Sequence, residues 1–185
     1  MKRCSWAQSD VMKDYHDKEW CVPVHNDRKL FEMLILEGAQ AGLSWETIWK
    51  RAATYRKAFD NFDARKIAKY TAKEVKRLID DPGIIRNRLK IASTINNAKR
   101  FLEVKKKIGS FDKYIWSFVN GKPIKNKFKT IKQIPAKTEI SDAMSKDLKQ
   151  RGFSFVGTTI CYAFMQSVGM VNDHVITCFR YNKLK

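Results

Sequence analysis

The chain has 185 residues, of which 44% are hydrophobic and 12% aromatic, with few glycines and prolines. This composition excludes a disordered chain, and the length allows one compact domain or two closely packed lobes with a real hydrophobic core. The 37 lysines and arginines exceed the 19 aspartates and glutamates and leave a formal net charge of +18. Such an excess predicts a polyanionic partner and favours nucleic acid over an anionic membrane surface, without deciding between DNA and RNA.

The start of the chain and its apolar runs indicate where the protein works. No apolar run is long enough to span a bilayer, and the first residues lack the apolar core of a signal peptide. We therefore expect a cytoplasmic protein with no membrane partner. In that reducing compartment the cysteines are expected as thiols or metal ligands rather than disulfides; they are Cys4, Cys21, Cys161 and Cys178.

The first part of the chain predicts short, closely spaced helices. Residues 30–43 are apolar on nearly every side, which predicts a helix buried in the middle of the fold, with Asp27 as its N-cap. Ser44 is suited to cap a second helix over 45–59. A third helix is expected after Asp63.

The middle of the chain predicts two helices joined by a tight turn. Thr71 and Glu74 have the spacing of a capping box for the first of them. Residues 81–83, Asp-Pro-Gly, are a turn signal, and a long polar helix is expected over about 87–107.

The last part of the chain predicts further helices, over 111–119, 141–151 and 158–168. Gly152 and Gly169 are expected to end the last two. A basic loop is expected over 121–137, and 153–156 is the only stretch with a weak strand pattern. We therefore predict an all-α fold without internal repeats or a flexible linker.

The predicted hairpin over residues 80–88 is a candidate for binding the DNA backbone. Backbone N–H groups and the positive end of a helix dipole come together in such a turn, which suits a phosphate and reads no base sequence. The residues expected to contribute are Gly83, Ile84, Arg86, Arg88 and Lys90. An ordinary helical hairpin fits the same pattern, and the net charge favours DNA.

Glu37 lies on an apolar stripe of the helix predicted over 30–43, because it follows Leu34 by three residues and Leu30 by seven. A buried glutamate can simply bond a neighbouring backbone group or a tyrosine hydroxyl. It can also serve as an acceptor in a ligand pocket. The second interpretation is favoured by the aromatic residues in the same quarter of the chain, which are Trp6, Tyr15, Trp20 and Trp45.

Two cysteines and two histidines near the chain ends form a candidate metal site. They are Cys4, His16, His174 and Cys178, and the last two have the i, i+4 spacing of a helix. Such a set suits tetrahedral zinc, and four protein ligands leave no open position for catalysis. Buried thiols with two unrelated histidines are the alternative, because the spacing matches no standard zinc finger.

Six segments spread over nearly the whole chain form a pattern of high specificity. They read RCSW (3–6), YHDKEW (15–20), LFEM (30–33), LEGAQAGLSW (36–45), FSFVGTTICY (153–162) and VNDHV (171–175). In this order they resemble the 3-methyladenine DNA glycosylase I family. The resemblance implies a helix-hairpin-helix glycosylase fold with a helical lobe over 27–110, and a second lobe of residues 1–26 and 111–185 around one structural zinc ion.

The resemblance also implies roles for particular residues. The zinc ligands are Cys4, His16, His174 and Cys178. Glu37 is the carboxylate that hydrogen-bonds the base, Tyr15 and Trp45 stack on it, and Trp6 and Trp20 border the pocket. The loop that enters the DNA stack is Gly42-Leu43-Ser44, with Leu43 as the wedge. The sequence departs from the family at Cys21, where glycine is common.

The activity that the resemblance implies is hydrolysis of the N-glycosidic bond of 3-methyladenine in alkylated duplex DNA. The base would be flipped out, an abasic site would remain for base excision repair, and the protein would act as a monomer. The sequence shows no lysine in a plainly apolar setting for Schiff-base chemistry, which predicts a monofunctional glycosylase. Two other interpretations stay open: a non-catalytic, zinc-stabilised DNA-binding module and an RNA-associated basic protein.

Overall fold

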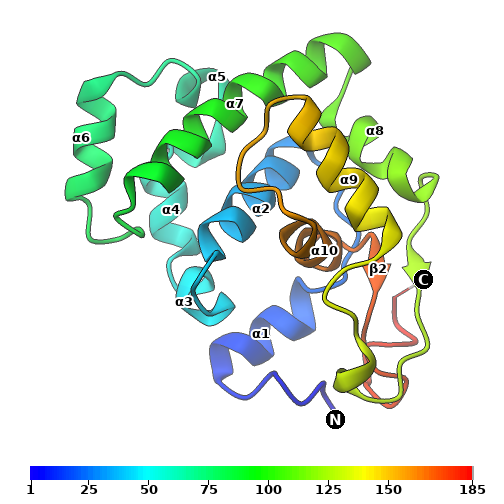
Figure 1. Ribbon diagram of the computed structural model, residues 1–185. Helices are drawn as coiled ribbons and strands as arrows, with labels where there is room; N and C mark the ends of the chain where they lie inside the picture. Colours follow the sequence, from blue (N-terminus) through cyan, green and yellow to red (C-terminus); the bar gives the residue numbers. More distant parts are fainter. Residues whose placement is uncertain (185) are drawn as a thin grey trace.

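A computed structural model describes residues 1–184 and is built mostly of helices (Figure 1). The α-helices are α1 (Asp10–Lys18), α2 (Asp27–Gln40), α3 (Trp45–Trp49), α4 (Ala52–Ala58), α5 (Ala64–Ile67), α6 (Ala72–Asp80), α7 (Arg88–Ile108), α8 (Phe111–Trp116), α9 (Glu139–Gln150) and α10 (Thr158–Ser167). Short 3-10 helices are η1 (Asp60–Phe62), η2 (Ser117–Val119) and η3 (Ile131–Gln133). Two-residue strands β1 (Ile124–Lys125) and β2 (Val171–Asn172) pair in parallel. The predicted helical fold is therefore confirmed.

Helix α2 runs through the centre of the molecule and packs against α3, α7, α8 and α10 (Figure 1). Ten consecutive residues of α2, from Leu30 to Ala39, are buried, as its nearly continuous apolar sequence predicts. The larger hydrophobic core forms around this helix and includes Phe31, Phe101 and Phe164. Any polar side chain on the central part of α2 is therefore held inside the protein.

The helix ends agree with the sequence in most places. Ser44 caps α3, Asp63 caps α5 and Asn87 caps α7. Thr71 and Glu74 form the expected capping box at the start of α6. The left-handed glycines that follow α9 and α10 stand where helix ends were predicted, at Gly152 and Gly169.

Two predictions about the N-terminal helices were wrong. The N-cap of α2 is Asn26. The Asp27 carboxylate instead accepts a hydrogen bond from the Asp112 N–H (2.8 Å) and forms an ion pair with Lys105 (2.7 Å). The single helix predicted over 45–59 is broken into α3 and α4. The break lies at Arg51, which leaves the helical conformation and donates to the Thr47 carbonyl.

Two further differences concern segments without a strong local pattern. Residues 153–156 form a loop, because Phe155 has a left-handed φ of 55° and the side chain of Asn97 bonds the backbone of Ser154. Helix α1 was not predicted, although Ser9 caps it and Met12, Tyr15 and His16 form its buried face.

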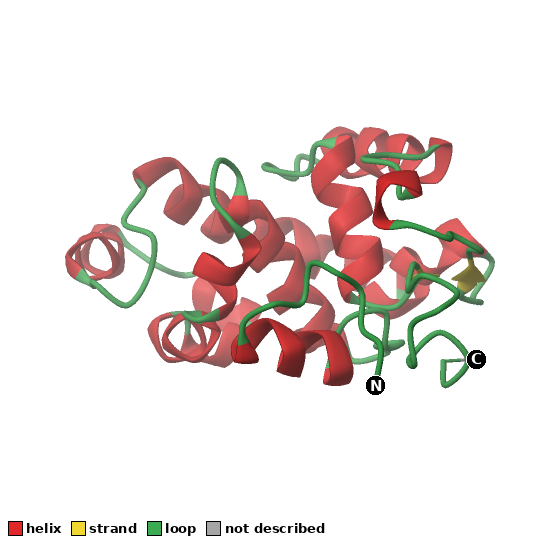
Figure 2. Cartoon of the chain, turned by 90° about the horizontal axis from the view of Figure 1, so that it is seen from below, coloured by secondary structure: helices red, strands yellow, loops and turns green. Residues whose placement is uncertain are grey.

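The two ends of the chain lie on the same side of the molecule and share a smaller hydrophobic core (Figure 2). This core includes Cys4, Tyr15, Trp20 and Cys178, and the Phe179 N–H donates to the Lys2 carbonyl. The lobe boundaries at 27–110 and at 1–26 with 111–185 stay a prediction, and Lys185 lies outside the described residues. Within residues 1–184, none of the helices has both the length and the apolar character needed to cross a membrane.

Gly169 permits a close contact between the end of α10 and the segment that follows α1. It has a left-handed φ of 72°, and a Cβ there would lie 2.3 Å from the Val22 carbonyl carbon. Gly121 has nearly the same φ, 71°, but no described atom would lie within 4 Å of its Cβ. The two positions therefore separate backbone strain from steric overlap.

We predict that Gly169→Ala destabilises the protein more than Gly121→Ala does. Both substitutions carry the left-handed backbone penalty of about 1–2 kcal/mol. Only Gly169→Ala adds overlap with a neighbouring backbone, which costs about 1–3 kcal/mol more. Urea unfolding measures both. Equal losses would show that residues 22–23 move aside without cost.

Candidate active site and metal cluster

A cavity of about 410 Å³ lies between the two cores. Its walls are Trp6, Tyr15, Trp20, Glu37, Gln40, Trp45, Ile131, Ile134, Ala163 and Gln166. All five residues that the sequence placed in a base pocket therefore line one cavity. They reach it from α1 and the residues on either side of it, from the last turn of α2 and from the first residue of α3.

Glu37 brings a nearly buried carboxyl group into this cavity, with only 3% of the residue exposed. Burial raises the pKa of Glu37 to about 8, and the Ser167 hydroxyl opposes this shift by hydrogen bonding. No described cationic side chain forms an ion pair with it. The cavity therefore holds an acid that is ready to ionise when a hydrogen-bond donor or a cation binds beside it.

The aromatic residues of the cavity pack closely against one another. The rings of Tyr15 and Trp45 are 5.5 Å apart, and those of Trp6 and Trp20 are 5.0 Å apart in an edge-to-face arrangement. A planar ligand between two parallel rings needs about 7 Å, twice a van der Waals contact. Tyr15 and Trp45 therefore form one continuous wall, on which a flat ring would stack from one side.

Gln166 adds a second polar group to the cavity wall. Its Nε2 donates to Asp173 Oδ2 (2.8 Å), and this carboxylate also accepts from Tyr162 and Asn126. Because a carboxylate only accepts, the amide nitrogen of Gln166 is turned toward Asp173. No described donor reaches Oε1, which is left as an acceptor for a ligand.

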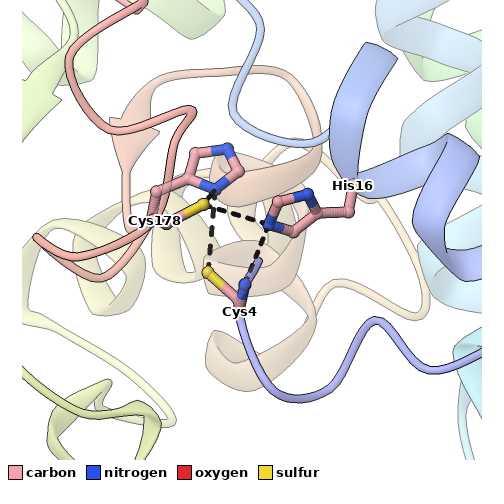
Figure 3. Close-up of side chains that lie close together, drawn as sticks. Cys4, His16 and Cys178 are labelled. Carbon is pink, nitrogen blue, oxygen red and sulfur yellow. Dashed lines mark hydrogen bonds between the residues drawn. The ribbon is translucent and has the colours of Figure 1, made fainter. Parts of the chain in front are cut away.

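Beside the cavity, two cysteines and two histidines converge on one point. The ligand atoms of Cys4, His16, His174 and Cys178 all lie within 4.8 Å of one another, and all four residues are buried. The Sγ atom of Cys178 is 3.4 Å from His16 Nε2 and 3.5 Å from His174 Nδ1, while Cys4 Sγ is 3.7 Å from His174 Nδ1. Figure 3 shows Cys4, His16 and Cys178 directed toward each other.

This arrangement fits a tetrahedral metal ion. Bonds of about 2.0–2.3 Å to nitrogen and sulfur correspond to ligand–ligand distances of about 3.4–3.8 Å. The other ring nitrogen of each histidine is also bound: His16 Nδ1 lies 2.7 Å from Asp17, and His174 Nε2 lies 3.3 Å from the Trp20 carbonyl. Burial raises the pKa of Cys4 to about 12, so a bound cation is what would ionise this thiol.

Comparison with known proteins identifies the family. The family model described as methyladenine glycosylase matches residues 6–181. The chain belongs to the methyladenine glycosylase family. It is therefore a glycosylase, which is a hydrolase.

Three relatives of this methyladenine glycosylase family member span nearly its whole length. DNA-3-methyladenine glycosylase 1 of Escherichia coli strain K12 is 50% identical, covering 98% of this chain and 97% of the relative. DNA-3-methyladenine glycosylase of Haemophilus influenzae is 49% identical, covering 95% and 96%. A solved structure of a 3-methyladenine DNA glycosylase I variant in complex with 3-methyladenine is 34% identical, with full coverage of both chains and a TM-score of 0.95.

The residues predicted to contact DNA lie outside the cavity. Gly42 has a left-handed φ of 78°, and Leu43 and Ser44 are exposed, with Leu43 at 39%. In the connection between α6 and α7, Arg86 and Arg88 are exposed and have no ion-pair partner among the described residues. The DNA contacts of these residues stay a prediction.

Parts of the predicted hairpin are engaged within the protein. The Gly83 N–H donates to the Asp81 carboxylate (2.7 Å), and Ile84 is buried. Lys90 is half-buried and donates to two backbone carbonyls at the end of α2. Lys90 is therefore not free to contact a phosphate as the sequence predicted.

Several residues of the cavity were not predicted from the sequence. Gln40 follows Glu37 by one helical turn, a spacing that could have indicated it. Gln166 and Ala163 lie on α10, and Ile131 and Ile134 come from the basic loop, where no local pattern marks them. The departure at Cys21 has a structural meaning: its φ is 62°, a left-handed conformation that glycine adopts more readily.

We predict that the stability difference between Glu37→Gln and the parent protein depends on pH. The folded-state pKa of Glu37 is about 8, above its ordinary 4.5, so the folded state holds this proton more tightly than the unfolded state. The contribution is therefore fully favourable below pH 4.5 and is lost as the pH rises toward 8, at about 1.4 kcal/mol per pH unit. Glutamine does not titrate, so Glu37→Gln should gain relative stability between pH 5 and 8. Paired urea unfolding curves measure it, and a constant difference would contradict the shift.

Proposed function

We propose that this protein excises 3-methyladenine from alkylated duplex DNA and leaves an abasic site for base excision repair. The observation that supports this most directly is the aromatic cavity with the buried carboxyl of Glu37. Two relatives about half identical in sequence are named as DNA-3-methyladenine glycosylases. A third is solved in complex with 3-methyladenine itself.

In this proposal the cavity recognises a flipped base by its shape, charge and donor groups. Tyr15 and Trp45 provide the stacking wall, while Trp6 and Trp20 close its border. Adenine carries an exocyclic amino group, which donates hydrogen bonds. Glu37 and the Oε1 atom of Gln166 are acceptors that would meet such donors.

The reaction needs little general acid catalysis, because methylation at N3 makes adenine a cation and therefore a good leaving group. Water attacks C1′ of the sugar, the C1′–N9 bond breaks, and the base leaves with the bonding electrons as neutral 3-methyladenine. The proton of the attacking water passes to solvent. The contribution of the protein is to hold the base outside the helix and to stabilise the positive charge on base and sugar, for which an ionised Glu37 is suited.

The DNA would be held by the loop and the hairpin outside the cavity. Leu43 is an exposed apolar side chain, suited to fill the gap that a flipped base leaves. Arg86 and Arg88 would bind phosphates in a helix-hairpin-helix contact beside Ile84, and the Gly83 N–H could take part only by leaving its hydrogen bond to Asp81. A single chain contains all of these groups, so we propose a monomer, which in bacteria would act in the cytoplasm, where the chromosome lies.

We also propose that the Cys4, His16, His174 and Cys178 cluster holds one structural zinc ion. Its donor set, distances and histidine partners fit zinc, and four protein ligands leave no position for a catalytic water. When bound, the ion would link the two ends of the chain. The reaction itself would proceed at the neighbouring cavity.

We predict that purified protein releases 3-methyladenine from methylated duplex DNA and that Glu37→Gln does so about 10- to 150-fold more slowly. This range corresponds to about 1.5–3 kcal/mol for one hydrogen bond to a charged group. Single-turnover release of the free base measures it, with Glu103→Gln as the control, because Glu103 is exposed on α7. Failure of the folded parent protein to release the base would favour a non-catalytic DNA-binding module. Unchanged release by Glu37→Gln would contradict the role of Glu37.

We predict that the protein purifies with one zinc ion per chain and that Cys178→Ser greatly reduces this content. Cys161→Ser is the matched control, because Cys161 is also buried but bonds the Val156 carbonyl, away from the cluster. Elemental analysis and thermal unfolding with and without a chelator measure both. A full zinc content in Cys178→Ser, or none in the parent protein, would refute the site.

A further inference from the structure

Lys90 occupies a position that local helix preferences do not explain. It lies in the first turn of α7, where the positive end of the helix dipole disfavours a cation. It is half-buried, and burial lowers its pKa. No described carboxylate lies within ion-pair distance of it. The partners of its ammonium group are instead backbone carbonyls of α2 and its C-cap.

The Lys90 ammonium donates to the Ala39 and Ala41 carbonyls, at 2.7 Å each. Both carbonyls lie at the C-terminal end of α2, where backbone acceptors have no partner within the helix and the dipole is negative. Two short bonds from a charged donor define the position of a chain segment much more firmly than one neutral bond. Lys90 therefore fixes the end of α2 to the start of α7.

The fixed segment is the first half of a tight turn. Ala41 has φ −45° and ψ 117°, Gly42 has φ 78°, and the Leu43 N–H donates to the Gln40 carbonyl (2.6 Å). These values describe a type II turn. It places the cavity residue Gln40 at one end and the exposed Leu43 at the other.

We propose that Lys90 is a positioning residue that couples the hairpin before α7 to the turn that carries Leu43. The hairpin residues Arg86 and Arg88 precede Lys90 in the same chain segment, and Lys90 holds the turn through Ala39 and Ala41. Phosphate binding at the hairpin thereby determines how far the Leu43 side chain extends into the base stack. This inference rests on the proposed function, because it takes Leu43 as the group that enters DNA.

The test compares Lys90→Met with the parent protein in three measurements. The first is single-turnover release of 3-methyladenine from methylated duplex DNA. The second is the fluorescence of 2-aminopurine placed beside an abasic site. This fluorescence rises when the Leu43 wedge unstacks the 2-aminopurine. The third is binding of free 3-methyladenine, read from tryptophan fluorescence, which needs the cavity but not the wedge.

We expect Lys90→Met to lose about tenfold in release and to lose most of the 2-aminopurine signal, as for one lost charge-assisted contact. Binding of free 3-methyladenine should stay within about twofold. Lys90→Arg should restore release, because a guanidinium also donates to two acceptors. Lys99→Met is the matched control, since Lys99 is exposed on the same helix.

Two outcomes would overturn the inference. One is unchanged release and unchanged 2-aminopurine fluorescence in Lys90→Met. The other is an equal loss of free-base binding, which would mean that Lys90 only supports the cavity. Lys90→Gln, which keeps one amide donor group, should give intermediate release and replaces the methionine variant if that does not fold. A parent protein that binds DNA but releases no base would instead refute the proposed function, independently of Lys90.

Discussion

The packing of the two chain ends against each other is the constraint on which the candidate site depends. Tyr15 and His16 are neighbours on α1, and they serve different sites: Tyr15 lines the cavity, while His16 points into the Cys-His cluster. The cluster draws its other ligands from residues 4, 174 and 178. The position of the stacking wall is therefore set by contacts between segments that are far apart in sequence. The smaller hydrophobic core alone has few apolar residues with which to set this position.

Burial of Glu37 imposes the second constraint. A carboxyl group on the most buried helix of a protein opposes folding when it is ionised, and it is tolerated here because one side faces the cavity. Its neighbours are aromatic rings and the Ser167 hydroxyl rather than cations. The Glu37 carboxyl group therefore ionises poorly when the cavity is empty and readily when a cationic or hydrogen-bond-donating ligand fills it.

The sequence predicted what depends on local pattern and on recognisable motifs. Helix α2 followed from its apolar run, the start of α6 from its capping box, and the cavity residues from the family resemblance. The features it missed depend on partners distant in the chain. Asp27 does not cap α2, because its carboxylate binds Lys105 and the Asp112 N–H. Lys90 donates hydrogen bonds to the end of α2 rather than to solvent. No sequence window of one helix contains such pairs.

These constraints together suggest how the cavity would separate a damaged base from a normal one. An unmodified adenine is neutral, so placing it beside Glu37 leaves either a protonated acid that can no longer accept through both oxygens, or a buried charge without a counterion. A methylated, cationic adenine would remove that cost because its charge would compensate the carboxylate, and the aromatic wall of Tyr15 and Trp45 would attract a cation as well. Selectivity would then arise from the charge that also weakens the glycosidic bond. The bases that would fit the cavity best are then those that need the least catalytic help to leave.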